Sequence, residues 1–213
     1  MARPRLILLG WAFALPACGP TVTAEPAVPQ SAASDAPRNA TPLVAGAWGS
    51  VRSGRHGLEI PLPSRGQWSV NDRQEAWLVA QHSASRSELR LRAWRAPRAN
   101  APESCLEQAR LWRPDLPEPS TATLIEQRAL VAPAGYRGTV WVGVKQVGDA
   151  AEGDAVAVGA RTGRCFVLWY RTRIRGNAAE TVVTENLATV SAGVIDRIRE
   201  VGIEDTVPRE RRP

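Results

Sequence analysis

The stretch Cys165-Phe166-Val167-Leu168-Trp169-Tyr170 decides the fold of this chain. Every side chain in it is apolar or aromatic, whereas a strand with one face in water alternates apolar and polar residues. We therefore expect a central strand that is covered on both faces. Arg161-Thr162-Gly163 precedes this strand and is typical of a hairpin turn, with glycine where a positive φ is needed. Residues 155–160 are thus its predicted antiparallel neighbour.

Residues 87–96 have the alternating pattern of a half-buried strand. Leu89, Leu91 and Ala93 fall on one face of it. The opposite face carries Glu88, Arg90, Arg92 and Trp94. This alternation indicates one face on the core and one face towards water or a partner.

Shorter apolar runs predict five further strands. They are expected at residues 58–62, 67–70, 76–82, 124–131 and 139–147. The Ser64-Arg65-Gly66 turn predicts that the first two of these strands form a hairpin. Because Pro61 has no N–H to donate, its strand is expected near a sheet edge.

Two helices are predicted, one short and one long. Asn100-Ala101-Pro102-Glu103 is typical of a helix start, because asparagine caps open N–H groups and proline suits the first turn. Pro114 ends this helix, and Cys105 lies on its inward face. Asn177-Ala178-Ala179-Glu180 begins the second helix in the same way. Apolar residues three or four apart then continue that helix to Gly202.

These elements predict an α+β domain with a mainly antiparallel sheet of about six to seven strands, flanked by a short helix and a long C-terminal helix. The order of the elements resembles the Mog1/PsbP-like α/β/α sandwich. Members of that family mostly act as binding or assembly factors and usually lack catalytic machinery. The resemblance therefore implies a non-catalytic role, although a fold alone does not fix a function.

The start of the chain has the form of an export signal. Arg3 and Arg5 precede an apolar run of about ten residues, which is well short of the ~20 needed to span a bilayer. The following Leu15-Pro16-Ala17-Cys18-Gly19 resembles the lipobox of bacterial lipoproteins. In that family the cysteine becomes the lipidated first residue of the mature chain, so the resemblance implies an acyl anchor, palmitate included, on Cys18. Cleavage after Ala24, with Cys18 incidental, is the alternative.

Composition divides the 213 residues into four segments. Residues 1–17 are the predicted lipoprotein signal peptide, and 18–46 are a flexible tether rich in proline, alanine and serine. Residues 47–206 form the single α+β domain, and 207–213 a charged tail. Gly19 is compatible with sorting to the outer membrane, so we expect a domain that is exported and held on the periplasmic side of that membrane.

Two cysteines remain once Cys18 carries lipid. Exported proteins form disulfides readily, so Cys105 and Cys165 are the natural pair. A bridge between them would close a loop of about 60 residues and stabilise the fold by ~3–4 kcal/mol. Two separately buried thiols are the alternative, because pairing requires a short Cα separation that the sequence does not reveal.

The sequence offers little catalytic chemistry. A hydrolase would pair His82 with Ser85 or Ser87 and an acid such as Glu88, but the chain has no G-x-S-x-G elbow. No Cys/His cluster has zinc spacing, and no glycine-rich nucleotide-binding motif occurs. We therefore expect no metal, no cofactor and no nucleotide.

Arg90, Arg92 and Trp94 form the candidate site for an anionic ligand. Arginine stacks on tryptophan, and its fork matches carboxylates and phosphates. The alternative is a solvated face balanced by Glu88, or a face covered by the long helix. The formal net charge is +6 for the whole chain and +4 without the leader, but nucleic acid is not an expected partner, because the chain is exported and has no recognised binding module.

The sequence thus predicts a lipid-anchored cell-envelope protein whose domain binds or assembles without catalysis. Its expected partner is an envelope protein or an anionic polymer. A small periplasmic hydrolase using His82 and a purely structural envelope factor remain as alternatives.

Overall fold

The computed structural model of the protein describes residues 40–73, 75–97, 101–132 and 135–202. Within these residues the chain forms ten strands, two α-helices and two single-turn 3-10 helices. The strands are β1 (Trp48–Ser53), β2 (Leu58–Pro63), β3 (Trp68–Asn71), β4 (Leu78–His82), β5 (Ser87–Arg95), β6 (Thr123–Val131), β7 (Arg137–Val147), β8 (Ala150–Arg161), β9 (Arg164–Arg175) and β10 (Arg199–Glu200). The helices are α1 (Pro102–Trp112), η1 (Pro119–Thr121), α2 (Ala179–Gly193) and η2 (Ile195–Arg197).

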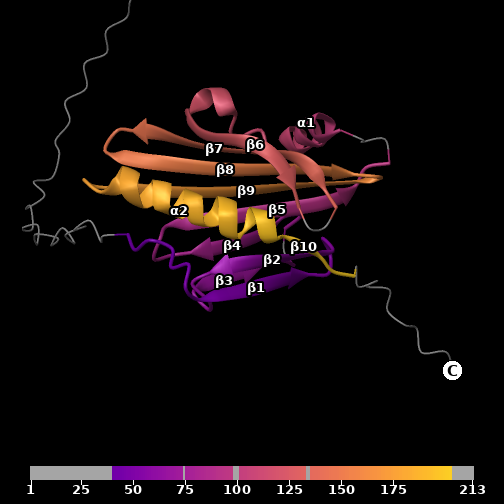
Figure 1. Ribbon diagram of the computed structural model, residues 1–213, viewed down its shortest axis with the longest axis horizontal. Coiled ribbons are helices and arrows are strands. Elements are labelled where there is room, and N and C mark those ends of the chain that lie inside the picture. Colours follow the sequence, from indigo (N-terminus) through magenta and orange to yellow (C-terminus); the bar gives the residue numbers. More distant parts are fainter. Residues whose placement is uncertain (1–39, 74, 98–100, 133–134, 203–213) are drawn as a thin grey trace, which may run out of the picture. The chain divides into compact units, whose positions relative to one another are not determined.

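The larger sheet has seven antiparallel strands in the order β3-β4-β5-β9-β8-β7-β6 (Figure 1). β9 contains residues 165–170 and lies between β5 and β8. Each of those six residues is at most 3% exposed. The predicted central strand, covered on both faces, is therefore confirmed, as is the α+β fold class with a mainly antiparallel sheet.

A smaller, three-stranded antiparallel sheet in the order β1-β2-β10 has no counterpart in the sequence prediction. β2 pairs with β1 along all six of its residues, and the predicted hairpin between 58–62 and 67–70 is wrong. β3 pairs instead with β4 in the larger sheet, so the Ser64–Gly66 turn passes the chain between sheets. β2 is the middle strand of this sheet, so the edge position predicted for the strand of Pro61 is wrong. β10 reaches only Leu58 and Glu59, however, which leaves Pro61 with a ladder on one side alone.

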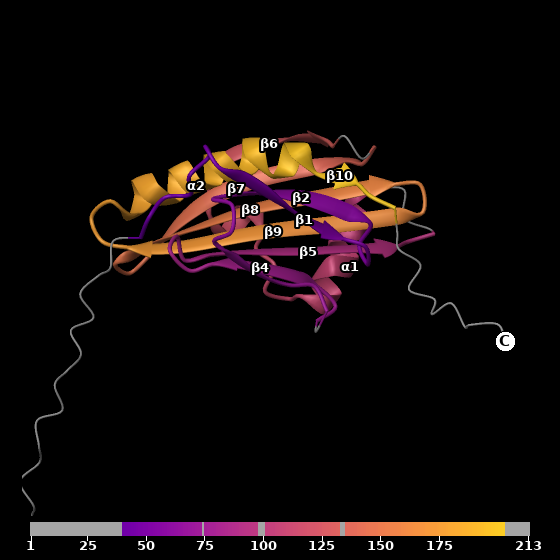
Figure 2. The same ribbon diagram turned by 90° about the horizontal axis from the view of Figure 1, so that it is seen from below.

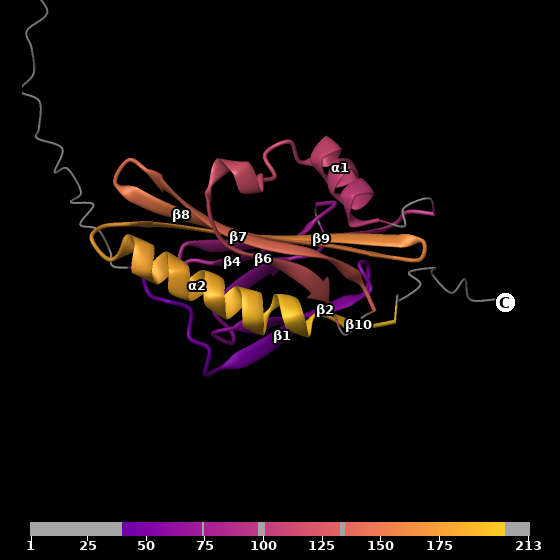
Figure 3. The same ribbon diagram turned by 45° about the horizontal axis from the view of Figure 1, so that its top comes forward.

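Two hydrophobic cores cover the two faces of the larger sheet (Figure 3). α1 packs Cys105 and Ala109 on one face. α2 and the smaller sheet lie side by side on the other face, where β2 contributes Leu58 and Ile60 (Figure 2). Apolar residues three or four apart form the buried side of α2, as the sequence predicts.

The long C-terminal helix is confirmed, but it ends at Gly193 and not at Gly202. A Cβ atom on Gly193 would lie 2.1 Å from Cη2 of Trp48, so the helix and the indole pack together only because this residue is glycine. Beyond it the chain forms η2 and then β10, whose Arg199 pairs with Glu59 of β2. The apolar spacing of the helix continues beyond Gly193, but the chain there pairs with β2 and so leaves the helix.

The two helices do not begin at the predicted N-cap residues. The N-cap residues of the two helices are Ala101 and Ala178, and no side chain caps either of them by a hydrogen bond. Asn100 lies outside the described residues. Pro102 at the first position of α1 is consistent with the predicted helix start.

Residues 40–46, assigned to the tether from sequence, contact the domain. Leu43 is buried, and its N–H donates to Oδ1 of the buried Asn186 in α2 at 2.8 Å. The N–H of Thr41 donates to the carbonyl of Ala84 at 3.0 Å. The predicted boundaries at residues 17 and 206 lie outside the described residues. None of the described helices has the length and apolar character needed to cross a bilayer.

Candidate functional site

Cys105 and Cys165 form the disulfide that the sequence predicts, with their Cα atoms 5.6 Å apart. The bond joins α1 to the central strand β9, and both residues are fully buried. It therefore holds α1 against one face of the larger sheet. Cys18, the predicted lipidation site, lies outside the described residues.

Arg90 lies on the predicted β5 face, but carboxylates surround it. Its Nε donates to Oε1 of Glu88, and one of its terminal nitrogens lies 3.6 Å from Oε2 of Glu75. Burial alone would raise the pKa of Glu88, yet hydrogen bonds from Arg90 and Gln81 hold that pKa below its ordinary value. Two carboxylates thus balance the one guanidinium, and little charge remains for a ligand.

Arg92 and Trp94 lie on the same face and pack against α1. The guanidinium of Arg92 lies 3.5 Å from the ring centre of Trp112, and burial lowers the pKa of this arginine. The indole N–H of Trp94 donates to Oε1 of Gln108 at 2.8 Å. The rings of Trp94 and Trp112 meet edge to face at 5.0 Å. One alternative from the sequence analysis is that a helix covers this face. That alternative describes Arg92 and Trp94, although the covering helix is α1 and not the long C-terminal helix.

His82 belongs to a buried chain of polar groups. Its Nδ1 accepts the backbone N–H of Ser85 at 3.1 Å and lies 2.7 Å from the hydroxyl of that serine. The hydroxyl chain then runs through Ser87, which lies 2.7 Å from the hydroxyl of Tyr170. On the other side of the ring, Nε2 contacts Oε1 of Gln67 at 2.9 Å. Burial lowers the pKa of His82, which favours the neutral ring.

This arrangement differs from the hydrolase hypothesis in its third member. Glu88 bonds Arg90 and Gln81, and it lies on the opposite face of β5 from Ser87. An amide oxygen, that of Gln67, takes the place of the expected acid. Ser85 is fully buried and His82 is 1% exposed, so a substrate would have to displace protein to reach either side chain.

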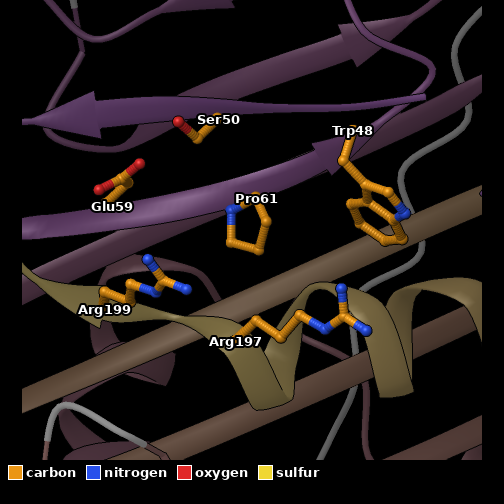
Figure 4. Close-up of a pocket in the computed structure, with 6 residues that line it drawn as sticks. All are labelled: Trp48, Ser50, Glu59, Pro61, Arg197 and Arg199. Carbon is orange, nitrogen blue, oxygen red and sulfur yellow. The ribbon is translucent and has the colours of Figure 1, made fainter.

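A hollow of about 200 Å³ opens on the outer face of the smaller sheet (Figure 4). It is lined by Trp48, Ser50, Glu59, Pro61, Arg197 and Arg199. Three separate pieces of chain build it: β1, β2 and the segment from η2 into β10. Figure 4 shows the strand residues along one side of the hollow and the two arginines along the other.

The strand register places the lining side chains on one face. Ser50 is the cross-strand partner of Pro61, and Glu59 is the partner of Arg199. Since directly paired residues project from the same face of a sheet, these groups share the outer surface of the smaller sheet. Residues of β2 between them, such as Ile60, point to the core instead.

The two arginines of the hollow differ from Arg90 and Arg92 in their partners. Both are exposed, and the guanidinium of Arg197 lies 5.4 Å from the ring centre of Trp48. Among the described residues, neither Arg197 nor Arg199 forms an ion pair. Among the residues that the structure describes, Glu59 is the only acidic one in the lining. The hollow therefore combines an aromatic surface with an excess of positive charge.

A second, larger hollow of about 590 Å³ adjoins the first and shares Trp48 and Ser50 with it. It lies between β1 and β3 and includes a second tryptophan, Trp68, whose indole N–H donates to the carbonyl of Pro63 at 2.7 Å. Arg65 contributes a further guanidinium to its lining. Trp48 is thus the aromatic residue common to both hollows.

Comparisons with known proteins find 17 similar chains among solved structures, and two of them are described below. No protein-family model and no curated protein matches the chain. A solved structure from Bacteroides thetaiotaomicron VPI-5482 is similar at 12% sequence identity and a TM-score of 0.41, over 74% of this chain and 49% of that one. LpqN, described as involved in cell envelope biogenesis of Mycobacterium tuberculosis, is similar at 15% identity and a TM-score of 0.40, over 73% of this chain and 91% of that one. This chain thus spans about half the length of the Bacteroides protein.

Sequence reasoning missed the hollow for a physical reason. Trp48 stands at the edge of the predicted domain, and Arg197 and Arg199 fall inside the predicted long helix. Only the end of α2 at Gly193 and the pairing of β10 with β2 bring them together. The one available signal was Gly193 itself, an unfavourable residue in an otherwise regular apolar stripe.

Proposed function

We propose that this protein is a lipid-anchored component of the cell envelope whose domain binds a partner without catalysis. The anchor is an acyl group on Cys18, palmitate included, in the outer membrane on its periplasmic side. The lipobox-like Leu15–Gly19 supports the anchor, and the Cys105–Cys165 disulfide supports an oxidising compartment. The partner is an envelope protein or an anionic polymer.

The open hollow at Trp48 is the observation that carries the binding role. Its aromatic ring and its two arginines, which form no ion pair with another described residue, lie at the surface, where a ligand reaches them without displacing protein. By contrast, His82 and Ser85 are buried and hydrogen-bonded to neighbouring groups. The accessible chemistry of the domain is therefore recognition, which supports binding over hydrolysis.

Metabolic labelling tests the anchor. Cells that express the full chain or its Cys18→Ala variant are fed radioactive palmitate and then fractionated into inner membrane, outer membrane and periplasm. We expect label in the outer-membrane fraction for the full chain and no label for the variant. An unmodified chain that begins at Met1, detected by mass spectrometry of the native protein, would rule out the anchor.

Substitution of His82 separates the binding role from the hydrolase alternative. His82→Gln keeps a polar side chain in the buried chain. Envelope extracts of the two proteins are compared against ester and amide substrates. We expect no activity that depends on His82. A hydrolytic activity that is present with the native chain and absent with the variant would establish the alternative function.

A further inference from the structure

We infer that the hollow at Trp48 binds a sugar ring that carries a carboxylate or phosphate group, as found in acidic glycans. This inference deepens the proposed binding function and rests on it for its biological setting. Five features of the hollow indicate this ligand class: its charge, its ring surfaces, its polar groups, its size and its neighbour.

The charge selects an anion. Arg197 and Arg199 approach the hollow from one side and form no ion pair among the described residues. A guanidinium presents several N–H donors in a plane, which matches the oxygens of a carboxylate or phosphate group. Two such groups beside one carboxylate, that of Glu59, leave an excess of positive charge among the described lining residues. A neutral ligand would give these two guanidinium groups no charged partner.

The ring surfaces select a flat, partly apolar group next to the anion. Trp48 and Pro61 supply an indole and a pyrrolidine ring to the lining. The C–H bonds on one face of a sugar ring pack against such surfaces and lose contact with water. Gly193 lies against the indole, since a Cβ atom there would fall 2.1 Å from Cη2 of Trp48. The helix end therefore restricts the position of the indole before a ligand arrives.

Ser50 and Glu59 give the hollow polar groups for ring hydroxyls. Ser50 both donates and accepts, while an ionised Glu59 only accepts. An acceptor suits a sugar hydroxyl and repels the anionic substituent. Glu59 would therefore orient the ring, with its hydroxyls towards β2 and its charged group towards the arginines.

The size fits one ring and not a large ligand. The hollow measures about 200 Å³, whereas sites for drug-sized ligands span roughly 300–1,000 Å³. The adjoining hollow of about 590 Å³ shares Trp48 and carries Trp68 and Arg65. A chain of sugars bound at the first hollow thus has a second aromatic and basic surface within reach, which favours a polymer over a free monosaccharide.

A titration of the purified full chain tests this assignment. The protein is extracted from the envelope in a neutral detergent, and the indole N–H signals are followed by NMR, with that of Trp48 assigned from Trp48→Phe. The probes are glucuronic acid and glucose 6-phosphate, with glucose and inorganic phosphate as matched halves of the ligand. We expect a saturable shift of the Trp48 signal with both acidic sugars, and an affinity at least about tenfold weaker for either half alone.

Three variants locate the site. Arg197→Gln and Arg199→Gln should each weaken binding of the acidic sugars by about tenfold. Arg52→Gln is the matched control: it removes the same charge from the same face of the smaller sheet, but Arg52 does not line the hollow. Its effect should stay below about threefold, the size of a screened surface interaction.

Other results would overturn the assignment. If Arg52→Gln weakened binding of the acidic sugars as much as Arg197→Gln and Arg199→Gln, the binding would reflect only general electrostatic attraction. If inorganic phosphate bound as tightly as the acidic sugars, the sugar ring would contribute nothing to recognition. No saturable shift with either acidic sugar would remove the site altogether. The titration does not depend on Cys18, so a failed palmitate labelling would refute the anchor alone, and a failed titration would refute the ligand alone.

Discussion

Two surfaces of this domain combine arginine with tryptophan, and they use the combination in opposite ways. Under α1, Arg92 stacks on Trp112, and Arg90 lies between two carboxylates. On the smaller sheet, Arg197 lies beside Trp48 with no carboxylate partner among the described residues. The first surface is closed by its own helix, and the second remains open.

The difference shows that residue types do not identify a binding site by themselves. A guanidinium that is already stacked and neutralised within the fold gives a ligand little further free energy, because the ligand only exchanges one partner for another. A guanidinium without a carboxylate partner, at the rim of a hollow, gives up mainly bound water when it contacts an anionic ligand. Arginine and tryptophan lie closer together in sequence at the closed surface, yet the guanidinium groups without a carboxylate partner among the described residues lie at the open surface.

Removing the disulfide should have the largest effect on this comparison, because it holds α1 over the closed surface. Its loop spans 60 residues, so Cys105→Ala with Cys165→Ala should lower the free energy of unfolding by about 3–4 kcal/mol. Urea unfolding measures the loss. Amide exchange in α1 should also speed up as the helix loosens over Arg92 and Trp94.

Cys18→Ala is the matched control for that experiment, since it removes a cysteine from outside the described domain. It should leave the unfolding free energy of the detergent-solubilised protein unchanged. If the double variant were as stable as this control, the bridge would not be what holds α1 in place.

Gly193→Ala should disturb the open surface by a smaller amount. The new Cβ atom would overlap the indole of Trp48, and overpacking of this kind costs about 1–3 kcal/mol. In a Trp48→Ala background the clash disappears, and the same change should become neutral or stabilise by up to about 1 kcal/mol, because alanine favours helix. Thermal unfolding of the four proteins gives the coupling; simple additivity would show that the helix end does not press on the indole.

Acid should act on the interior and leave the open arginine surface unchanged. Burial lowers the pKa of His82 and of His56 below the ordinary value of 6.5, so the unfolded chain binds protons more readily than the folded one. Stability should therefore be complete above about pH 6.5 and fall as the pH drops towards the folded-state values, by at most about 1.4 kcal/mol per pH unit for each histidine. His82→Gln should flatten part of this dependence.

Unfolding curves between pH 7.5 and 5 measure this loss, and anion titrations over the same range supply the contrast. Neither histidine lines the hollow at Trp48, so the affinity for glucuronic acid, whose carboxylate stays ionised over this range, should stay constant while stability falls. A profile that is equally steep without His82 would assign the acid sensitivity to other groups.

Sequence patterns predicted the larger sheet because each signal was local. Residues 165–170 are apolar on both faces, and residues 87–95 alternate, so their places in the sheet follow from burial alone. The Cys105–Cys165 bridge was within reach because both residues fell on predicted inward faces. In each case the face on which a residue lies followed from the pattern of its own element.

The smaller sheet and its hollow could not be predicted in this way. Val194 and Ile198 continue the apolar spacing of α2, and nothing near them in sequence shows that Trp48 packs on Gly193. β10 has only two residues, and it exists because Leu58 and Glu59 offer it a strand edge. Such an element is created by tertiary contacts, so local pattern predicts a longer helix in its place.

The smallest expected effect is also the most direct comparison of the two surfaces. Arg92→Gln removes a cation from above the ring of Trp112 at a half-buried site and should lower the free energy of unfolding by about 1 kcal/mol. Arg197→Gln removes an exposed cation at a longer distance from Trp48 and should change stability by less than about 0.5 kcal/mol. The two substitutions are chemically identical, so urea unfolding isolates the contribution of the surroundings. A larger loss at Arg197 than at Arg92 would mean that this guanidinium is committed to the fold, and the open surface would then offer a ligand no more than the closed one.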